Sequence, residues 1–374
     1  MIKVLHVISD TGIGGAGVLL TNLLRHANTA LFSYSVGLPK GSKLAPRLER
    51  FGIRTIPLEG LADRSADPAA IPSLLALIKR EKPDVLHTHA GLSARISGLL
   101  GGVRVRVNTK HCLTGGNGNR LFRGTAENLL STHFIATAEA AAEALSRNGI
   151  NSTKIHIIEN GSDPVLPLSE DEKSHLRRAL RIPENAFVIG MAARMERGKG
   201  QEILLEAARL SAPAESSLYY LFVGTGSMEA ELRQKTAEWG LSQNVKFLGF
   251  REDVGKIMNL FDLNVNCSYI SETSSLSLSE GMSLGILPVV SNLGGNPFMA
   301  DFGRCGAIVP PRDPEALAKT ILALYRSPRA REELSRRSLA HYEAHFRAED
   351  MARRTEALYL AALGNAAIDK IPTP

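Results

Sequence analysis

Short apolar segments with strand character alternate with helical segments along almost the whole chain, in two successive series. The first series opens at residues 2–9 and the second at residues 187–191. Apolar strands separated by helices of about 10–15 residues favour parallel pairing, because each helix returns the chain to the edge where the next strand starts. The alternation therefore predicts two α/β units, each built on a parallel sheet.

Three prolines mark a pause between the two series. Pro164, Pro167 and Pro183 punctuate a polar stretch over residues 165–186, which holds a short expected helix at 169–180. We interpret this stretch as the interdomain connection. The remaining elements are expected as follows: strands at 33–38, 85–87, 103–108, 133–137 and 155–158, then at 219–223, 245–248, 263–266, 287–291 and 306–309, and terminal helices at 314–325, 329–345 and 348–363.

Composition places the chain among ordinary globular proteins. Its 374 residues are 44% hydrophobic and 22% charged, enough for two cores. We find no run of about 18 apolar residues, and the opening segment is interrupted by polar side chains, so we expect neither a spanning helix nor a signal peptide. Three scattered cysteines fit a reducing compartment, and the expected location is cytoplasmic.

The net charge of +6 lies entirely in the first half of the chain. Residues 1–185 carry 23 Lys and Arg against 16 Asp and Glu, whereas residues 186–374 carry 21 against 22. A positive excess suits a phosphate-bearing or membrane-surface partner. The chain has no basic patch interleaved with aromatic residues, which argues against nucleic acid as the partner.

A glycine-rich turn follows the first expected strand. Gly12, Gly14 and Gly17 formally match the dinucleotide-binding spacing, and Gly15 adds a fourth glycine before a helix. The acidic residue that would bind a ribose about 20 residues further on is missing. The interpretation we prefer is a tight turn facing a ligand cleft, ahead of a purely structural turn and of dinucleotide binding.

Two cations flank the loop after the strand at 187–191. Arg194 and Lys199 stand just before the expected helix at 201–210. A guanidinium fork and a lysine point charge near a helix N-terminus can neutralise a diphosphate without a metal. The alternative is ordinary solvated surface charge.

Two carboxylates, Glu272 and Glu280, stand eight residues apart around a run of small polar residues. If both lay on one helix they would sit about 80° apart, and we expect the helix itself at 281–284. A helix start between them would expose the N–H groups of Ser275 and Leu276 to a phosphate. The carboxylates themselves suit sugar and ribose hydroxyls.

Together these motifs resemble the retaining glycosyltransferases of family 4, over residues 1–360. The match consists of the Glu-x7-Glu pair, Arg194 with Lys199, and the following segments in order: 14–16, 83–89, 109–111, 158–161, 224–226, 249–253 and 285–290. The resemblance implies the GT-B fold, with two facing Rossmann-like domains and a cleft between them. It places residues 1–170 and a crossover helix at 348–364 in the first domain and residues 186–345 in the second.

The resemblance also implies roles for single residues. Arg194 and Lys199 would bind the diphosphate and stabilise the leaving group, Glu272 would contact the sugar, and His111 would assist beside the transferred sugar. The expected donor-binding residues are Gly14, Gly15, Arg194, Lys199, Gly224, Arg251, Asp253, Ser275, Leu276 and Glu280. We expect no metal and no cofactor, since the chain lacks an Asp-x-Asp motif.

The implied activity is transfer of a sugar from a nucleoside-diphosphate sugar, UDP-sugar first, to a hydroxyl of a saccharide or lipid-linked saccharide in bacterial surface polysaccharide synthesis. A sugar-nucleotide epimerase, a non-catalytic sugar-nucleotide-binding protein and a nicotinamide-dependent enzyme are the alternatives. The family's Gly-Phe-Gly after the first glutamate is replaced here by residues 273–275, so sugar specificity does not carry over.

Two further features stay open. Four basic residues recur at helical spacing: Lys43, Arg47, Arg50 and Arg54. They indicate either a solvated helix or a peripheral contact with an anionic membrane. His87 and His89 are two residues apart on a strand and point the same way. We expect them to be hydrogen-bonded cleft histidines rather than metal ligands.

Overall fold

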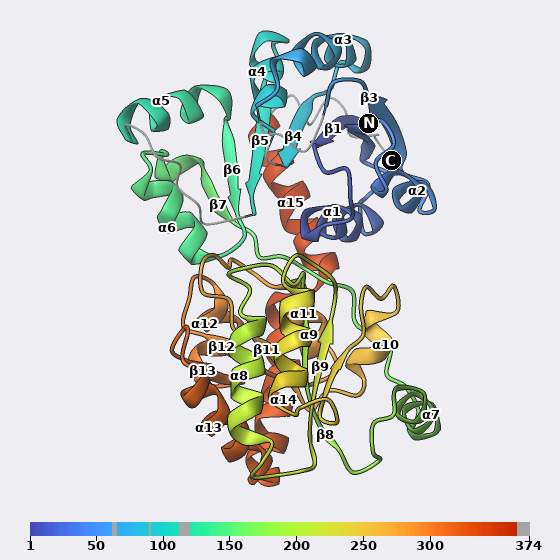
Figure 1. The fold of residues 1–374 in the computed structure, drawn as a ribbon. Coiled ribbons are helices and arrows are strands. Elements are labelled where there is room, and N and C mark those ends of the chain that lie inside the picture. Colours follow the sequence, from blue (N-terminus) through green and yellow to red (C-terminus); the bar gives the residue numbers. More distant parts are fainter. Residues whose placement is uncertain (62–65, 90, 112–119, 365–374) are drawn as a thin grey trace. The chain divides into compact units, whose positions relative to one another are not determined.

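The computed structural model describes residues 1–61, 66–89, 91–111 and 120–364 (Figure 1). The chain divides into two compact units. The first comprises Met1–Gly161 together with Ala348–Pro374, and the second comprises Ser162–Arg347. The division falls after Gly161, earlier than the expected connection, and helix α7 (Glu170–Leu180) belongs to the second unit.

The first unit is built on a seven-stranded parallel sheet in the order β3-β2-β1-β4-β5-β6-β7. Its strands are β1 (Ile2–Ile8), β2 (Phe32–Pro39), β3 (Arg54–Leu58), β4 (Val85–His89), β5 (Val105–Lys110), β6 (His133–Ala136) and β7 (Ile155–Ile157). Its helices are α1 (Gly15–Arg25), α2 (Leu44–Glu49), α3 (Ile71–Glu81), α4 (Leu92–Leu100), α5 (Arg120–Leu130), α6 (Glu139–Arg147) and α15 (Ala348–Leu363).

Helix α15, the red helix of Figure 1, packs beside α1 and strand β5 of the first unit. Its Tyr359 is fully buried, and the hydroxyl shares a 2.6 Å hydrogen bond with Nδ1 of His87 on β4. Glu356 accepts hydrogen bonds of 2.7 Å from the Tyr34 hydroxyl and the Asn28 amide. Helix α15, the last helix among the described residues, is therefore part of the first unit's core.

The second unit repeats the architecture with a six-stranded parallel sheet in the order β10-β9-β8-β11-β12-β13. The strands are β8 (Phe187–Ala192), β9 (Leu218–Val223), β10 (Val245–Phe247), β11 (Leu263–Asn266), β12 (Leu287–Ser291) and β13 (Ala307–Val309). The helices are α7, α8 (Gln201–Ser211), α9 (Glu229–Glu238), α10 (Val254–Met258), α11 (Leu276–Met282), α12 (Asn296–Met299), α13 (Pro314–Tyr325) and α14 (Pro328–His345).

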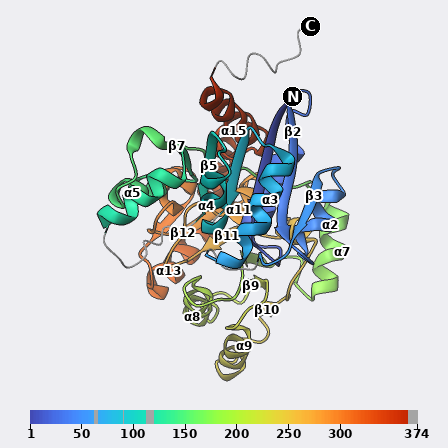
Figure 2. The same ribbon diagram turned by 90° about the horizontal axis from the view of Figure 1, so that it is seen from above.

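Both faces of the second sheet are buried. Successive side chains of a strand point to opposite faces, and neighbouring residues of one strand enter two different cores. Along β8, Ile189 packs into the core formed with α8 and α13, whereas Val188 packs into the core that contains Ile257 and Met258 of α10. Figure 2 views the same ribbon from above. Among the described residues, no helix combines the length and apolar character that crossing a membrane requires.

The two sheets confirm the parallel α/β architecture and all six expected strands of the second unit. The alternation missed β3, because we assigned Arg54 to a basic helix. That helix is shorter than expected: α2 ends at Glu49, and Gly52, with φ +72°, turns the chain into β3. Arg54 stands on the strand, where its guanidinium is ion-paired with Glu81 at 2.7 Å.

Candidate active site

In each unit the strand order reverses direction between two neighbouring strands, β1 and β4 in the first and β8 and β11 in the second. Loops leaving the carboxyl ends of such strands diverge to opposite sides of the sheet and leave a crevice, where α/β proteins bind ligands. Several of the predicted site residues follow these strand ends. Arg194 and Lys199 follow β8, Glu272 follows β11, and the glycine-rich turn follows β1.

The loop after β8 is fixed by its own backbone. The Lys199 amide donates to the Glu196 carbonyl at 3.0 Å, and the Gln201 side chain donates to the Arg194 carbonyl at 2.8 Å. Gly200, with φ +89°, gives the turn into α8. The Arg194 side chain is exposed, and Lys199 is half-buried. The loop thus holds Lys199 toward the protein and Arg194 in solvent.

Lys199 and Glu272, which are 73 residues apart in sequence, meet at this point. The ammonium of Lys199 lies 3.0 Å from Oε2 of Glu272. The same oxygen accepts hydrogen bonds from Asn266 Nδ2 at 3.2 Å and from the Ser268 hydroxyl at 3.0 Å. Three donors therefore converge on one carboxylate oxygen whose side chain is only 11% exposed.

Sequence reasoning did not identify Asn266 and Ser268 as site residues. The signal was present: polar side chains at 264, 266 and 268 alternate with apolar ones at the end of an otherwise apolar strand. In a buried parallel strand, polar residues at period two mark the end that faces a ligand or another polar group.

Helix α11 starts between the two glutamates, as predicted, but it runs from Leu276 to Met282 rather than over 281–284. The Ser275 hydroxyl caps it by accepting from the Leu278 amide at 3.4 Å. Glu272 precedes the helix and lies in the loop, so the angle of about 80° between the two carboxylates does not apply. Glu280 lies in the last turns of α11 and is half-buried.

Arg251 and Asp253 form a closed pair after β10. The guanidinium donates two hydrogen bonds of 2.8 Å, from Nε and Nη2, to the two carboxylate oxygens. The hydrogen bond from Arg251 lowers the pKa of Asp253. A backbone bond of 2.8 Å from the Gly224 amide to the Gly249 carbonyl joins this segment to the loop after β9.

In the first unit the glycine-rich turn leads directly into α1, which starts at Gly15 with Gly14 as N-cap. Gly15 is exposed and has open space where a side chain would stand, whereas Gly17 is buried against Leu44. The turn therefore leaves the first amide groups of an eleven-residue helix accessible to an anion.

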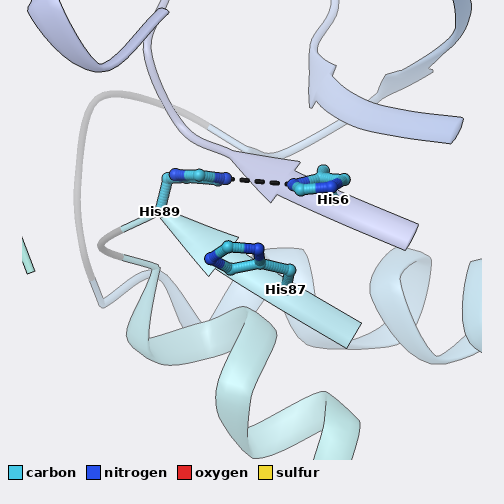
Figure 3. Close-up of side chains that lie close together, drawn as sticks. All are labelled: His6, His87 and His89. Atoms are coloured by element: carbon cyan, nitrogen blue, oxygen red, sulfur yellow. Dashed lines mark hydrogen bonds between the residues drawn. The ribbon is translucent and has the colours of Figure 1, made fainter. Parts of the chain in front are cut away.

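Four histidines gather at the junction of β1, β4 and β5. Nδ1 of His6 and Nε2 of His89 share a hydrogen bond of 3.1 Å, and Nδ1 of His89 shares one of 3.2 Å with Nε2 of His111. His87 stacks on His89 with ring centroids 4.5 Å apart, and its Nε2 shares a 2.7 Å bond with the Thr109 hydroxyl. Figure 3 shows His6, His87 and His89 side by side.

The cluster agrees with the expectation of hydrogen-bonded histidines at 87 and 89. It adds His6, which sequence reasoning missed because His6 lies 81 residues away on β1, in direct register with His87. Burial lowers the pKa of His6 to about 3 and that of His111 to about 4. All four rings are therefore neutral near pH 7, since burial also lowers the pKa values of His87 and His89.

Comparisons with known proteins identify the family. The profile described as "Glycosyltransferase Family 4" matches residues 13–166, and that described as "Glycosyl transferases group 1" matches residues 172–340. The putative glycosyltransferase EpsD of Bacillus subtilis is 30% identical over 187 residues, which are 50% of this chain and 49% of that protein. The chain therefore aligns with about half the length of EpsD.

Two further similarities extend over more of the chain. The UDP-Gal:alpha-D-GlcNAc-diphosphoundecaprenol alpha-1,3-galactosyltransferase of Escherichia coli is 28% identical over 62% of this chain and 63% of its own length. The crystal structure of Anabaena HepE in complex with UDP-glucose superposes with a TM-score of 0.83 at 23% identity, over 96% of this chain and 99% of that one. The chain belongs to the glycosyltransferases of family 4, with a group 1 transferase domain in its second half, and it has the GT-B fold.

Proposed function

We propose that this protein is a retaining, metal-independent hexosyltransferase. It moves a sugar from a nucleoside-diphosphate sugar to a hydroxyl of a saccharide or lipid-linked saccharide. The donor we favour is a UDP-sugar. The observation that carries the proposal is the convergence of Lys199, Asn266 and Ser268 on the Glu272 carboxylate at the strand-order reversal of the second unit. The names of HepE's ligand and of the E. coli relative support the choice of UDP and of a lipid-linked acceptor.

In the proposed reaction the cations and the Glu272 carboxylate have different tasks. Breaking the bond between the anomeric carbon and the phosphate oxygen sends the electron pair to the diphosphate, where fixed cations stabilise the new charge. Lys199 and Arg194 are the cations for this task. When Lys199 turns to the diphosphate, Asn266 and Ser268 still hold Glu272, so its carboxylate can accept from the sugar hydroxyls. Front-face attack and double displacement both fit these groups.

Donor binding is the first test. We expect one member of a panel of UDP-, GDP- and ADP-sugars to raise the melting temperature, because a ligand at 100 times its Kd stabilises by about 2.7 kcal/mol. The shift and the slow release of nucleotide should persist in EDTA. Binding without release under any acceptor would favour a sensor, and interconversion of the sugar without transfer would favour an epimerase. A product whose NMR spectrum shows the inverted configuration at the anomeric carbon would refute retention.

Glu280 provides a sharper test of the same site. Loss of a hydrogen bond between a carboxylate and a ligand hydroxyl costs about 1.5–3 kcal/mol, so we expect Glu280→Ala to weaken donor binding roughly 10- to 150-fold. The matched control is Glu238→Ala, an exposed position on α9 of the same unit. Unchanged donor affinity in Glu280→Ala, measured by calorimetry, would remove Glu280 from the site.

The first unit offers a surface for an anionic membrane or lipid-linked acceptor. Lys43 and Arg50 are exposed at the two ends of α2, and Arg47 is half-buried between them. Phe51 is 47% exposed next to them, with the Arg25 guanidinium 4.6 Å from the centre of its ring. Cations around an exposed aromatic ring are typical of peripheral membrane contacts. Arg54 is not part of this surface, because it stands on β3 and is ion-paired with Glu81 at the end of α3.

Charge reversal tests this surface. Each basic residue near an anionic membrane contributes about 1 kcal/mol, so Arg47→Glu/Arg50→Glu should lower binding to phosphatidylserine-containing liposomes at least tenfold. Transfer to a soluble acceptor should be kept. Arg329→Glu/Arg336→Glu, with the same charge change on α14, is the control. Equal sedimentation of the Arg47→Glu/Arg50→Glu variant and the wild type with liposomes would refute the contact.

A further inference from the structure

His6, His89 and His111 form a continuous row rather than a loose cluster. The planes of His6 and His89 differ by 20° and those of His89 and His111 by 19°, with ring centroids 5.4 Å apart in both pairs. These values are expected for rings that meet nitrogen to nitrogen, and Figure 3 shows this arrangement for His6 and His89. Three strands, β1, β4 and the end of β5, contribute one ring each.

The end-to-end geometry favours hydrogen bonds over a metal ion. A zinc ion on the line between two nitrogens that face each other needs two bonds of about 2.0–2.1 Å each, or about 4 Å between the nitrogens. A tetrahedral ion off that line would need both ring nitrogens turned toward the ion at about 109° and away from each other. The nitrogens of His6 and His89 are 3.1 Å apart. His87 has both nitrogens engaged, with the hydroxyls of Tyr359 and Thr109. The rings therefore meet through shared protons.

A row of neutral imidazoles has only two arrangements that keep both hydrogen bonds, because each ring carries one proton on one of its nitrogens. In the first arrangement, Nδ1 of His6 donates to His89, Nδ1 of His89 donates to His111, and His111 carries its proton on Nδ1. In the second, every proton has moved to Nε2, and Nδ1 of His111 carries no proton. The state of His111 is thus tied to that of His6, two strands away.

The buried end of the row distinguishes the two arrangements. His6 is 0% exposed, and its Nε2 has no hydrogen-bond partner in the part of the chain that the structure describes. The second arrangement would bury an N–H group there without an acceptor, which folded proteins avoid more strongly than a bare acceptor. The first arrangement leaves only a bare ring nitrogen at that place.

We infer that His89 and His6 are positioning residues that hold His111 as a neutral imidazole with its proton on Nδ1, so that His111 serves as a hydrogen-bond donor and not as a general base. The part of this inference that concerns catalysis rests on the proposed function. The donor N–H would suit a sugar hydroxyl or a phosphate oxygen of the donor substrate. The lowered pKa values of His6 and His111 support the neutral state of the row.

Nitrogen-15 NMR of the histidine-labelled full chain tests the inference without any substrate. Near pH 7.5 we expect His6, His89 and His111 to show protonated Nδ1 and bare Nε2, although free histidine in water prefers the opposite form. A protonated Nε2 on His111 in the wild-type protein would overturn the inference. Resonances are assigned by single His→Gln variants.

Activity gives the second readout. In His89→Phe the bond to His111 is lost, and we expect a mixture of His111 tautomers and a fall in kcat of about 10- to 100-fold, as for other misplaced catalytic groups, at unchanged KM for the donor. His89→Gln, whose amide can donate and accept, should restore the Nδ1–H form and most of kcat. His133→Phe, a partly buried histidine on β6 outside the row, should change neither.

The two readouts separate the possible failures. If His89→Phe keeps the wild-type tautomer and kcat, His89 does not position His111. If the wild-type protein turns over no donor, the proposed function is refuted, while the nitrogen shifts still decide whether the row fixes the His111 tautomer.

Discussion

Lys199→Ala is expected to lower kcat/KM for sugar transfer by about 10²- to 10³-fold, the effect of removing one preorganised donor from developing charge. The reason lies in the position of Lys199. Lys199 is the half-buried cation of the loop after β8, and it already lies 3.0 Å from Glu272, so no large movement is needed to bring it into the site. Arg194, which is exposed, would retain part of the electrostatic stabilisation.

The variant should remain folded. The Lys199 side chain is 33% exposed, and partly exposed ion pairs contribute about 0–1 kcal/mol to stability. Glu272 keeps its hydrogen bonds from Asn266 and Ser268 in the variant. A melting temperature close to that of the wild type, combined with the loss of turnover, is the expected result, and Lys246→Ala on β10 is the control. Wild-type turnover in Lys199→Ala would exclude Lys199 from leaving-group stabilisation.

The fold was predictable where the chain follows simple periodicities. Short apolar strands with helices between them predicted the parallel sheets and every strand except β3. Strand β3 was not predicted, because its five residues, RTIPL, include only two buried side chains and follow a basic run that itself has helical spacing. At such an edge strand, the positive φ of Gly52 decides between helix and strand, and that torsion depends on tertiary contacts.

The site was only partly predictable, for a different reason. Motif order identified Lys199 and Glu272, but the contact between them depends on β8 and β11 being neighbours, which follows from the sheet order and not from spacing along the chain. The same holds for His6 and His89, which meet because β1 pairs with β4. Residues such as Asn266 and Ser268, which hold a functional group without belonging to a motif, become visible only once the strands are paired.

The position of Lys199 depends on its neighbour Gly200. A Cβ at Gly200 would lie 2.1 Å from the Cys267 carbonyl oxygen and 2.6 Å from its carbon, far inside contact distance, and both are backbone atoms of β11's exit. The φ of +89° adds the strain that side chains meet in the left-handed region. The loop after β8 can pass this close to β11 only because residue 200 has no side chain.

We therefore expect Gly200→Ala to destabilise the second unit by about 2–5 kcal/mol, combining an overpacking cost of about 1–3 kcal/mol with about 1–2 kcal/mol of backbone strain. Gly240→Ala isolates the strain, because Gly240 has φ +68° and no atom within 4 Å of the position of a Cβ. It should cost only about 1–2 kcal/mol. Denaturant unfolding of both variants measures the difference. The clash separates the loop from β11. Gly200→Ala should therefore lose donor binding even at denaturant concentrations below its unfolding midpoint, whereas Gly240→Ala should keep it. Equal unfolding free energies for the two variants would show that the contact between residue 200 and Cys267 does not hold Lys199 beside Glu272.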